Sequence, residues 1–407
     1  MLALTGCADD SSGNGGGSGQ GVRPGATKEE YIEAFKDVDP IKLKVQTPSP
    51  KGAATGKPME DYFAAVEEWS GGKITFDIAY SNAVAQPAEI DDALNDGRLD
   101  IASILPIYEP SEYPAHAQLI EGTIISHQSP VVGVLQSNAW PNEVAFANAE
   151  IMAEYERHNL VPLVPFFDSG PQALFCSEPR NSVGKIKGTS ITASGTAQSS
   201  QIKAIGGTPV SVPYTEIFES LQRGVVDCAN ASFTVAVLGG FIPAAPHVAI
   251  DLQNGFALAP GGLAASKDTW DRLPLVARQL LWDRLDVYLE SNIKSKIWPN
   301  FAEAVKQIRQ NGGKVDLFAP DASEALKKQN ETLVNQIRTK SGATDGNALV
   351  DAMQKAAQKW LTEAQNVGLP ADVDYNNFDE WLSTANPDLS KYTEKLMNEI
   401  WLPRRPS

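Results

Sequence analysis

The residues that most often carry catalysis or hold metals are sparse in this chain and lack the necessary spacing. None of the four histidines stands three or four residues from another histidine, as in the H-E-x-x-H pattern. The sequence has no G-x-S-x-G turn, no G-x-x-x-x-G-K-[ST] phosphate loop and no G-x-G-x-x-G between a strand and a helix. A Ser/His/Asp triad built from distant residues stays open, because triads are defined by geometry. The sequence predicts neither a metal nor a cofactor, and it favours a protein that is not an enzyme.

The three cysteines suggest an exported protein rather than a metal site. Leu4-Thr5-Gly6-Cys7 resembles the lipobox of bacterial lipoproteins, and a Gly/Ser-rich segment that suits a flexible tether follows it. We expect lipidation at Cys7. The segment before Cys7 is too short for a full signal peptide, so we expect a start further upstream; the alternative is a disordered tail with a chance cysteine. Cys176 and Cys228 can form a disulfide in an oxidising compartment, but their spacing does not decide this.

Composition sets limits on the partners. The 407 residues suggest two or three domains, and a hydrophobic content of 42% is enough for packed cores. The 34 Lys and Arg residues against 50 Asp and Glu residues give a net charge of -16. This balance argues against nucleic acid or an anionic membrane as a partner held by charge, since both need a basic surface. Beyond the N-terminus, no stretch approaches the roughly 20 apolar residues of a membrane span.

The elements that would position a site follow an α/β pattern. Residues 41–45 alternate apolar and polar side chains, as does the segment 73–80, and both predict strands. Between them, residues 59–69 carry apolar side chains at helical spacing and end at a pair of glycines. Strand–helix–strand is the building unit of parallel sheets.

An internal repeat indicates two similar halves. Residues 89–102 and 216–229 both fit E-I-x-x-x-L-x-x-G-x-x-D-x-A. Each copy predicts a helix that ends at a glycine, where a left-handed residue is needed, followed by a short strand. Helix–Gly–strand is also a common arrangement that can recur by chance. We interpret the repeat as one element from each of two α/β lobes.

Later segments complete the expected organisation. The apolar run 160–167 predicts a strand buried on both faces. Helices are predicted over 270–312, with a break near Pro299, and over 321–340 and 347–366. The expected units are a truncated signal and tether (1–40), lobe I (41–162 with parts of 250–320), lobe II (163–249), a hinge return with long helices (250–340) and a C-terminal helical extension of unknown role (341–407).

Two stretches closely resemble the solute-binding proteins of tripartite ATP-independent periplasmic (TRAP) transporters. They are VGKIKGTSI at 183–191 and AIGGTPVSVPYTEIFESLQRGVVD at 204–227. The first half agrees through GGKITFDIAY and EIDDALNDGRLDIA, and the similarity covers roughly residues 41–318. The resemblance implies a bilobed α/β fold of the periplasmic-binding-protein type, with long bracing helices. It also implies a small solute in the interlobe cleft, integral membrane subunits as partners, and an extracytoplasmic location with a lipid anchor at Cys7.

The same resemblance places a ligand site that departs from the family. Most relatives hold a substrate carboxylate with an arginine at the position of Thr192, and some have a second one at Gln172. We therefore expect a neutral, semi-apolar pocket for an uncharged or aromatic solute, although Lys51, Arg180 or backbone N–H groups could still meet an organic acid. The candidate ligand-binding residues are Thr192, Gln172, Tyr214, Leu105, Ala231, Asn230, Ser194, Tyr108, Phe167, Asp168 and Phe233. The alternatives to a transport role are a ligand-sensing module for signalling and an extracellular hydrolase; we expect a monomer.

Overall fold

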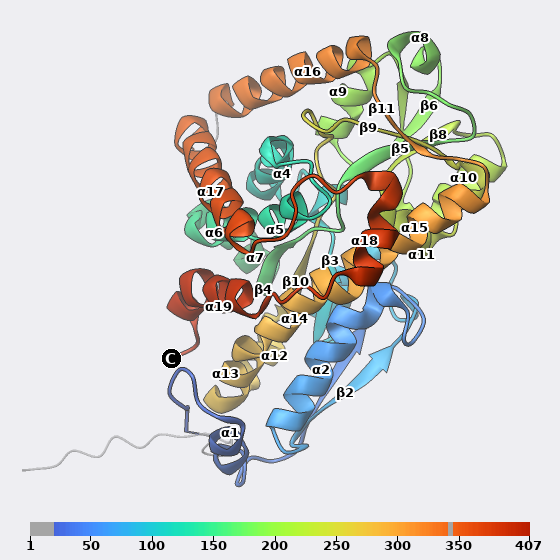
Figure 1. Cartoon of the computed structure of the whole chain (residues 1–407). Helices are drawn as coiled ribbons and strands as arrows, with labels where there is room; N and C mark the ends of the chain where they lie inside the picture. Colours follow the sequence, from blue (N-terminus) through green and yellow to red (C-terminus); the bar gives the residue numbers. More distant parts are fainter. Residues whose placement is uncertain (1–19, 341–344) are drawn as a thin grey trace, which may run out of the picture.

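The computed structural model describes residues 20–340 and 345–407. Its strands form two sheets, and helices cover both, as Figure 1 shows. The bilobed α/β architecture expected from the repeat is therefore confirmed. We call the units built on the two sheets the first and the second lobe. The first sheet has the order β2-β1-β3-β10-β4 and the second the order β11-β9-β5-β8-β6-β7.

The strands of the first sheet are β1 (Ile41–Gln46), β2 (Ile74–Ala79), β3 (Ile101–Ile104), β4 (Leu160–Phe167) and β10 (Gly261–Ser266). The strands of the second sheet are β5 (Gln172–Cys176), β6 (Ser190–Ala193), β7 (Thr208–Ser211), β8 (Cys228–Ser232), β9 (His247–Ile250) and β11 (Val315–Leu317). The chain thus passes between the sheets after β4 and again between β9 and β10. β4 belongs wholly to the first sheet and extends past the expected lobe boundary at residue 162.

The repeated motif makes the same connection in both lobes. Its helices are α3 (Ile90–Asn95) and α10 (Ile217–Gln222), and each is followed by a glycine with positive φ, Gly97 at 75° and Gly224 at 67°. A side chain with a Cβ atom rarely adopts this conformation, which explains the shared glycine. Each copy then leads into a central strand of its sheet, β3 or β8.

The shared aspartate of the motif has the same role in each copy. Asp100 accepts a hydrogen bond from the Lys44 backbone N–H at 2.7 Å, and Asp227 accepts one from the Ser190 backbone N–H at 2.8 Å. Lys44 lies in β1 and Ser190 in β6, the strands that pair with β3 and β8. The aspartate therefore ties the repeated strand to its parallel neighbour in each sheet.

The helices of the first half are α1 (Lys28–Ala34), α2 (Lys57–Trp69), α4 (Pro114–Glu121), α5 (Val132–Ser137), α6 (Trp140–Ala147), α7 (Ala149–Arg157), α8 (Val183–Ile186), α9 (Thr196–Ala204) and α11 (Phe233–Gly239). Those of the second half are α12 (Lys267–Arg272), α13 (Leu275–Asp283), α14 (Leu285–Ser291), α15 (Trp298–Gln310), α16 (Pro320–Thr339), α17 (Gly346–Asn366), α18 (Phe378–Thr384) and α19 (Ser390–Leu396).

One long helical run joins the two lobes. It consists of α14, a π-helical segment (Asn292–Ile297) and α15, and it crosses the molecule diagonally in Figure 1. α14 packs on α2 of the first lobe, and α15 packs on α11 of the second lobe. The predicted break near Pro299 corresponds to this π-helical segment, because a proline supplies no N–H for the regular helical hydrogen bond.

The C-terminal extension contains α17, α18 and α19, and it contacts both lobes. Asn376 accepts a hydrogen bond from the Val315 N–H at 2.8 Å and donates one to the Val315 carbonyl at 2.9 Å, at the edge strand β11. At β4, an edge strand of the first sheet, Trp401 Nε1 donates a hydrogen bond to the Leu163 carbonyl at 2.8 Å. The extension thus covers an edge strand of each sheet, which are otherwise open to pairing.

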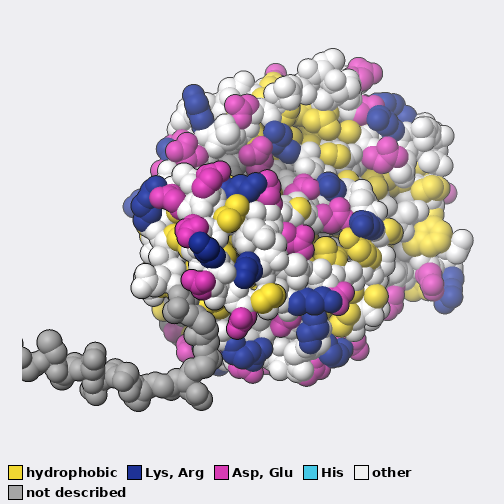
Figure 2. All heavy atoms as spheres, turned by 90° about the horizontal axis from the view of Figure 1, so that it is seen from below, with side chains coloured by type: hydrophobic (Ala, Val, Ile, Leu, Met, Phe, Trp, Pro, Cys, Tyr) yellow, Lys and Arg dark blue, Asp and Glu magenta, His cyan; other side chains and the backbone are white. Residues whose placement is uncertain are grey.

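The lower face of the molecule, in the orientation of Figure 1, carries charges of both signs. Figure 2 shows Lys and Arg side chains interspersed with Asp and Glu on this face. None of the helices in the described part of the chain is both long and apolar enough to cross a membrane. Cys7, the expected lipidation site, lies outside the described residues.

Candidate functional site

A small cavity lies between the two lobes. It encloses about 120 Å³, similar to the roughly 150 Å³ of an apolar cavity that takes up benzene. The first lobe supplies its wall through the ends of β1, β3 and β4, and the second lobe through β5, β8 and the residues after β6. Most of the lining is apolar, and its aromatic side chains are Tyr108, Phe167, Tyr214 and Tyr288. The space suits a compact molecule of about the size of one ring.

The structure brings together eight of the eleven ligand-binding candidates around this cavity. The candidates that line it come from both lobes, and they are Leu105, Tyr108, Phe167, Gln172, Ser194, Tyr214, Asn230 and Ala231.

The other three candidates point elsewhere. Thr192 is buried in β6, where its Oγ1 accepts a hydrogen bond from the Asn230 backbone N–H at 3.1 Å. Asp168 follows β4, and its carboxylate accepts hydrogen bonds from the Ser137 hydroxyl and the Ser169 N–H. Phe233 packs in an aromatic group with Phe175 and Phe301, at centroid distances of 5.2 and 4.1 Å. These residues therefore support the walls of the cavity without lining it.

Hydrogen bonds between the lobes cross beside the cavity. Asn82 Nδ2, in the first lobe, donates to the Tyr214 hydroxyl of the second lobe at 2.9 Å. The Tyr214 N–H in turn donates to the Tyr108 hydroxyl at 3.2 Å. Both tyrosines are on turns of 3-10 helix, one after β3 and one before α10. The lobes are thus in contact, as in a closed state around a ligand.

Several buried polar atoms of the cavity wall have no hydrogen-bond partner within the described residues. They belong to Ser169, Gln172, Asn230 and Thr234, whose exposed fractions are 7%, 2%, 1% and 1%. Gln172 in β5 and Asn230 in β8 lie on adjacent antiparallel strands, where Gln172 pairs with Ser232. A buried polar atom without a partner costs about 1–3 kcal/mol. A bound molecule that offers hydrogen bonds would remove this cost.

The cavity also contains a lysine that sequence reasoning missed. Lys296 lies in the π-helical segment and is 6% exposed, and its Nζ donates to Asn292 Oδ1 at 2.9 Å. The prediction of a neutral pocket is therefore wrong, because the cavity lining includes the basic side chain of Lys296. A signal was present in the sequence: Asn292, Lys296 and Asn300 recur every four residues, which places them on one face of a helix, and all three are buried.

The electrostatics of Lys296 follow from its burial. Burial lowers the pKa of Lys296 to about 8, while the negative charge of Asp168 opposes this change. Burial likewise raises the pKa of the Asp168 carboxyl to about 6, and its hydrogen bonds with Ser137 and Ser169 act in the opposite direction. At neutral pH, the cavity wall thus holds an ammonium group, with a carboxylate behind the wall.

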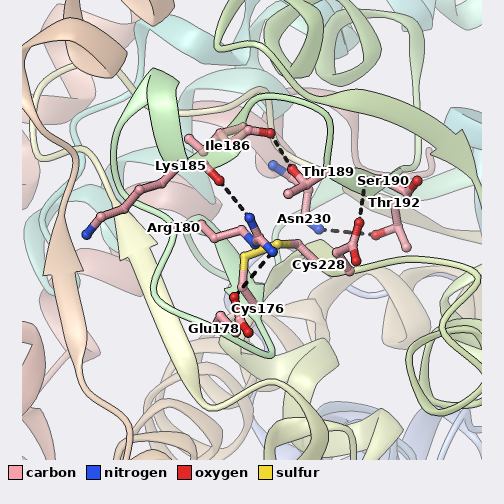
Figure 3. The surroundings of a disulfide bond; sticks show 11 residues. Cys176, Glu178, Arg180, Lys185, Ile186, Thr189, Ser190, Thr192, Cys228 and Asn230 are labelled. Atoms are coloured by element: carbon pink, nitrogen blue, oxygen red, sulfur yellow. Dashed lines mark hydrogen bonds and ion pairs between the residues drawn. A yellow bond between two sulfur atoms is a disulfide. The ribbon is translucent and has the colours of Figure 1, made fainter.

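Lys51 and Arg180, which could pair with the carboxylate of an organic acid, lie away from the cavity. Lys51 is exposed, and neither it nor Arg180 belongs to the lining. Figure 3 shows Arg180 next to the disulfide between Cys176 and Cys228, with a hydrogen bond from its Nη1 to the Lys185 carbonyl at 2.7 Å. Glu178 also pairs with this guanidinium, at 3.5 Å. The disulfide itself joins directly opposite residues of β5 and β8.

The chain is similar to proteins that bind small organic molecules. A curated solute-binding protein from Albidiferax ferrireducens is 22% identical over 260 residues, which cover 63% of this chain and 74% of the relative. Among solved structures, a marine metagenome TRAP solute-binding protein specific for aromatic acids, from an unidentified microbe, has a TM-score of 0.67 at 16% identity. The alignment covers 79% of this chain and 99% of that one.

Two further structures share the fold. The ectoine-binding protein of a TRAP transporter from Halomonas elongata has a TM-score of 0.65 at 17% identity, covering 78% of this chain and 99% of its own. A TRAP solute-binding protein from Bordetella bronchiseptica with bound mandelate has a TM-score of 0.65 at 18% identity, covering 79% and 99%. Residues 45–341 match the family described as bacterial extracellular solute-binding protein, family 7. The resemblance to TRAP solute-binding proteins is confirmed, and the chain belongs to this family.

Proposed function

We propose that the protein captures one small organic molecule in the interlobe cavity and delivers it, outside the cytoplasm, to the integral membrane subunits of a TRAP-type secondary transporter. The observation that carries this proposal is a set of polar atoms on Gln172 and Asn230 that face a mostly apolar, ring-sized cavity and have no hydrogen-bond partner among the described residues. A cavity with this wall holds a solute by shape and a few hydrogen bonds. Ligand contacts from both lobes favour the closed state. The ligand-bound, closed protein would therefore be the form that docks on the membrane subunits of the transporter.

The location and assembly belong to the same proposal. We expect a monomer anchored to the membrane by a lipid on Cys7, which the lipobox-like sequence supports. We also expect binding without turnover of the solute. The family comprises solute-binding proteins rather than enzymes, which supports this expectation.

A thermal-shift screen of the protein without residues 1–26 tests the binding function. The library should contain dicarboxylates, keto acids, aromatic acids and neutral aromatics. A ligand at 100 times its Kd should stabilise the fold by about 2.7 kcal/mol, which is readily measured. The transport step would then be tested by uptake of the radiolabelled ligand into cells with and without this chain.

Two variants with the same substitution locate the binding site. Ala259 lines the cavity, whereas Ala371 is exposed on a loop of the C-terminal extension. Ala259→Phe should fill the space and abolish the thermal shift, while Ala371→Phe should keep it. A shift that survives in Ala259→Phe would place the ligand elsewhere, and no shift with any compound would contradict the binding function.

A further inference from the structure

Lys296 is a buried cation whose hydrogen-bonding capacity is mostly unused. An ammonium group has three donors, and the described residues supply one acceptor to Nζ, the Asn292 side chain at 2.9 Å. Lys296 is 6% exposed, so bulk water does not take up the remaining donors in the closed state. Burying a charge without partners is costly. The position of Lys296 in the cavity wall therefore calls for an acceptor inside the cavity.

The described residues do not supply an anion to pair with Lys296 Nζ, so the acceptor has to come from a ligand. Among the described residues that line the cavity, Lys296 alone carries a formal charge. No carboxylate in the described part of the chain forms an ion pair with Nζ. Asp168 acts on Nζ only at longer range, and its two oxygens already accept hydrogen bonds from Ser137 and Ser169. The described residues thus place no anion against the ammonium group.

The scaffold around Lys296 fixes its place. Asn292 Nδ2 donates to Asn138 Oδ1 at 2.9 Å and to the Asp168 carbonyl at 3.2 Å, so the residue that holds Nζ is itself held by the first lobe. The π-helical segment supplies both Asn292 and Lys296. Single π-helical turns occur frequently at functional sites. A held amide and a buried lysine in such a turn form a built position for a negative group.

We propose that Lys296 binds the negative group of the solute, and that the solute is a compact monocarboxylate with an apolar body of about one ring. This inference rests on the proposed function and narrows its ligand class. One cation and a mostly apolar wall match one carboxylate, whereas a dicarboxylate would place its second charge against apolar side chains. The amides of Gln172 and Asn230 complete the polar contacts. Lysine thus takes over the charge pairing that an arginine provides in most relatives, from another element of the fold.

The test compares acids with their neutral amides. Benzoate, phenylacetate and succinate are titrated against benzamide and phenylacetamide by calorimetry and thermal shift, with wild-type protein, Lys296→Met and Lys296→Arg. Lys294→Met is the matched control, because Lys294 lies in the same segment but pairs with Glu290 at 3.0 Å outside the cavity.

The wild type should bind an aromatic monocarboxylate in preference to its amide and to succinate. Lys296→Met should weaken carboxylate binding roughly 10- to 100-fold, the range of hydrogen bonds to charged groups, and should erase the preference over the amide. Lys294→Met should bind as the wild type does, and Lys296→Arg should retain a preference for the acid. Far-UV circular dichroism and the Tm of each variant show that it is folded.

Four outcomes would overturn the inference. Equal binding of acid and amide by the wild type, or unchanged acid binding by folded Lys296→Met, would refute the role of Lys296 while solute binding stands. If only neutral compounds from the broad library shift the Tm, the ligand class is wrong and the binding function holds. If nothing in the library binds, carboxylates included, both proposals fail.

Discussion

Lys296 Nζ lies 4.4 Å from the centroid of the Phe167 ring, so the cation of the cavity rests on one of its aromatic walls. Phe167 ends β4 of the first sheet, whereas Lys296 belongs to the helical run between the lobes. A cation within about 6 Å of a ring face is attracted to it, more strongly when water is excluded. Before a ligand binds, this contact offsets part of the free-energy cost of burying the Lys296 charge. It also gives an aromatic acid a ring surface next to its charge partner.

The affinity for a carboxylate should fall as the pH rises above about 8. Burial lowers the pKa of Lys296 to about that value, and the neutral amine cannot pair with an anion. Above the pKa, Kd should increase about tenfold per pH unit, because binding then takes up one proton. The other titratable groups nearby are Asp168, with a pKa of about 6, and Tyr108, Tyr214 and Tyr288, whose pKa values burial raises.

Calorimetric titrations from pH 6.5 to 9.5 would measure this dependence. Lys296→Arg should flatten the profile, since arginine stays protonated throughout the range. A wild-type Kd that does not change up to pH 9.5 would contradict the pairing.

Asn230→Leu should weaken ligand binding without destabilising the empty protein. No described residue offers a hydrogen bond to either polar atom of the buried Asn230 side chain. Replacing the amide by an apolar group therefore removes a free-energy cost of the ligand-free protein. In the complex, the lost hydrogen bonds should reduce affinity about 5- to 20-fold. Calorimetry gives Kd, and urea denaturation gives the free energy of unfolding.

Asn148→Leu is the control for the same substitution. Asn148 caps α7 by accepting hydrogen bonds from the Glu150 and Ile151 N–H groups, away from the cavity. Its loss should cost about 1 kcal/mol of stability and leave Kd unchanged. The opposite pattern, a destabilised Asn230→Leu with normal affinity, would show that Asn230 serves only the fold.

Trp401→Ala should destabilise the whole protein, because the C-terminal extension is part of the core. Trp401 is fully buried, packs against Phe146 at a centroid distance of 5.8 Å and donates a hydrogen bond to Leu163. Truncating such a side chain costs about 3–5 kcal/mol. Leu402→Ala, at the next residue and 39% exposed, should change the stability by less than about 0.5 kcal/mol. Equal midpoints of urea unfolding for the two variants would mean that the extension is dispensable.

Regular elements could be predicted because their patterns are local. The apolar spacing of residues 59–69 predicted α2, which runs from Lys57 to Trp69. The glycines of the repeat, Gly97 and Gly224, predicted two helix ends that the structure has. Each of these signals depends on neighbouring residues, and the hydrogen bonds that satisfy them are equally local.

The site was harder to predict because it depends on strand faces and distant contacts. The family resemblance placed Thr192 in the cavity, but the Thr192 hydroxyl faces the Asn230 N–H instead. In a strand, successive side chains point to opposite faces, so a shift of one residue moves a side chain out of a site. Lys296 lies about 100 residues after Thr192 in the chain. Its spacing from Asn292 and Asn300 indicates one polar stripe on a helix, but no local pattern indicates that this stripe reaches the cavity.

The extension has a consequence for the rate at which a solute leaves the protein. Asn376 is attached to the outer strand of one sheet, and Trp401 to the outer strand of the other, so residues 376–401 link the lobes on the outside of the molecule. A movement that separates the lobes must carry this link along, or release it at one of its ends. The residence time of the solute is therefore set in part by hydrogen bonds at the outer edges, which never touch it. Substitutions there could adjust the exchange of cargo while the chemistry of the cavity stays the same.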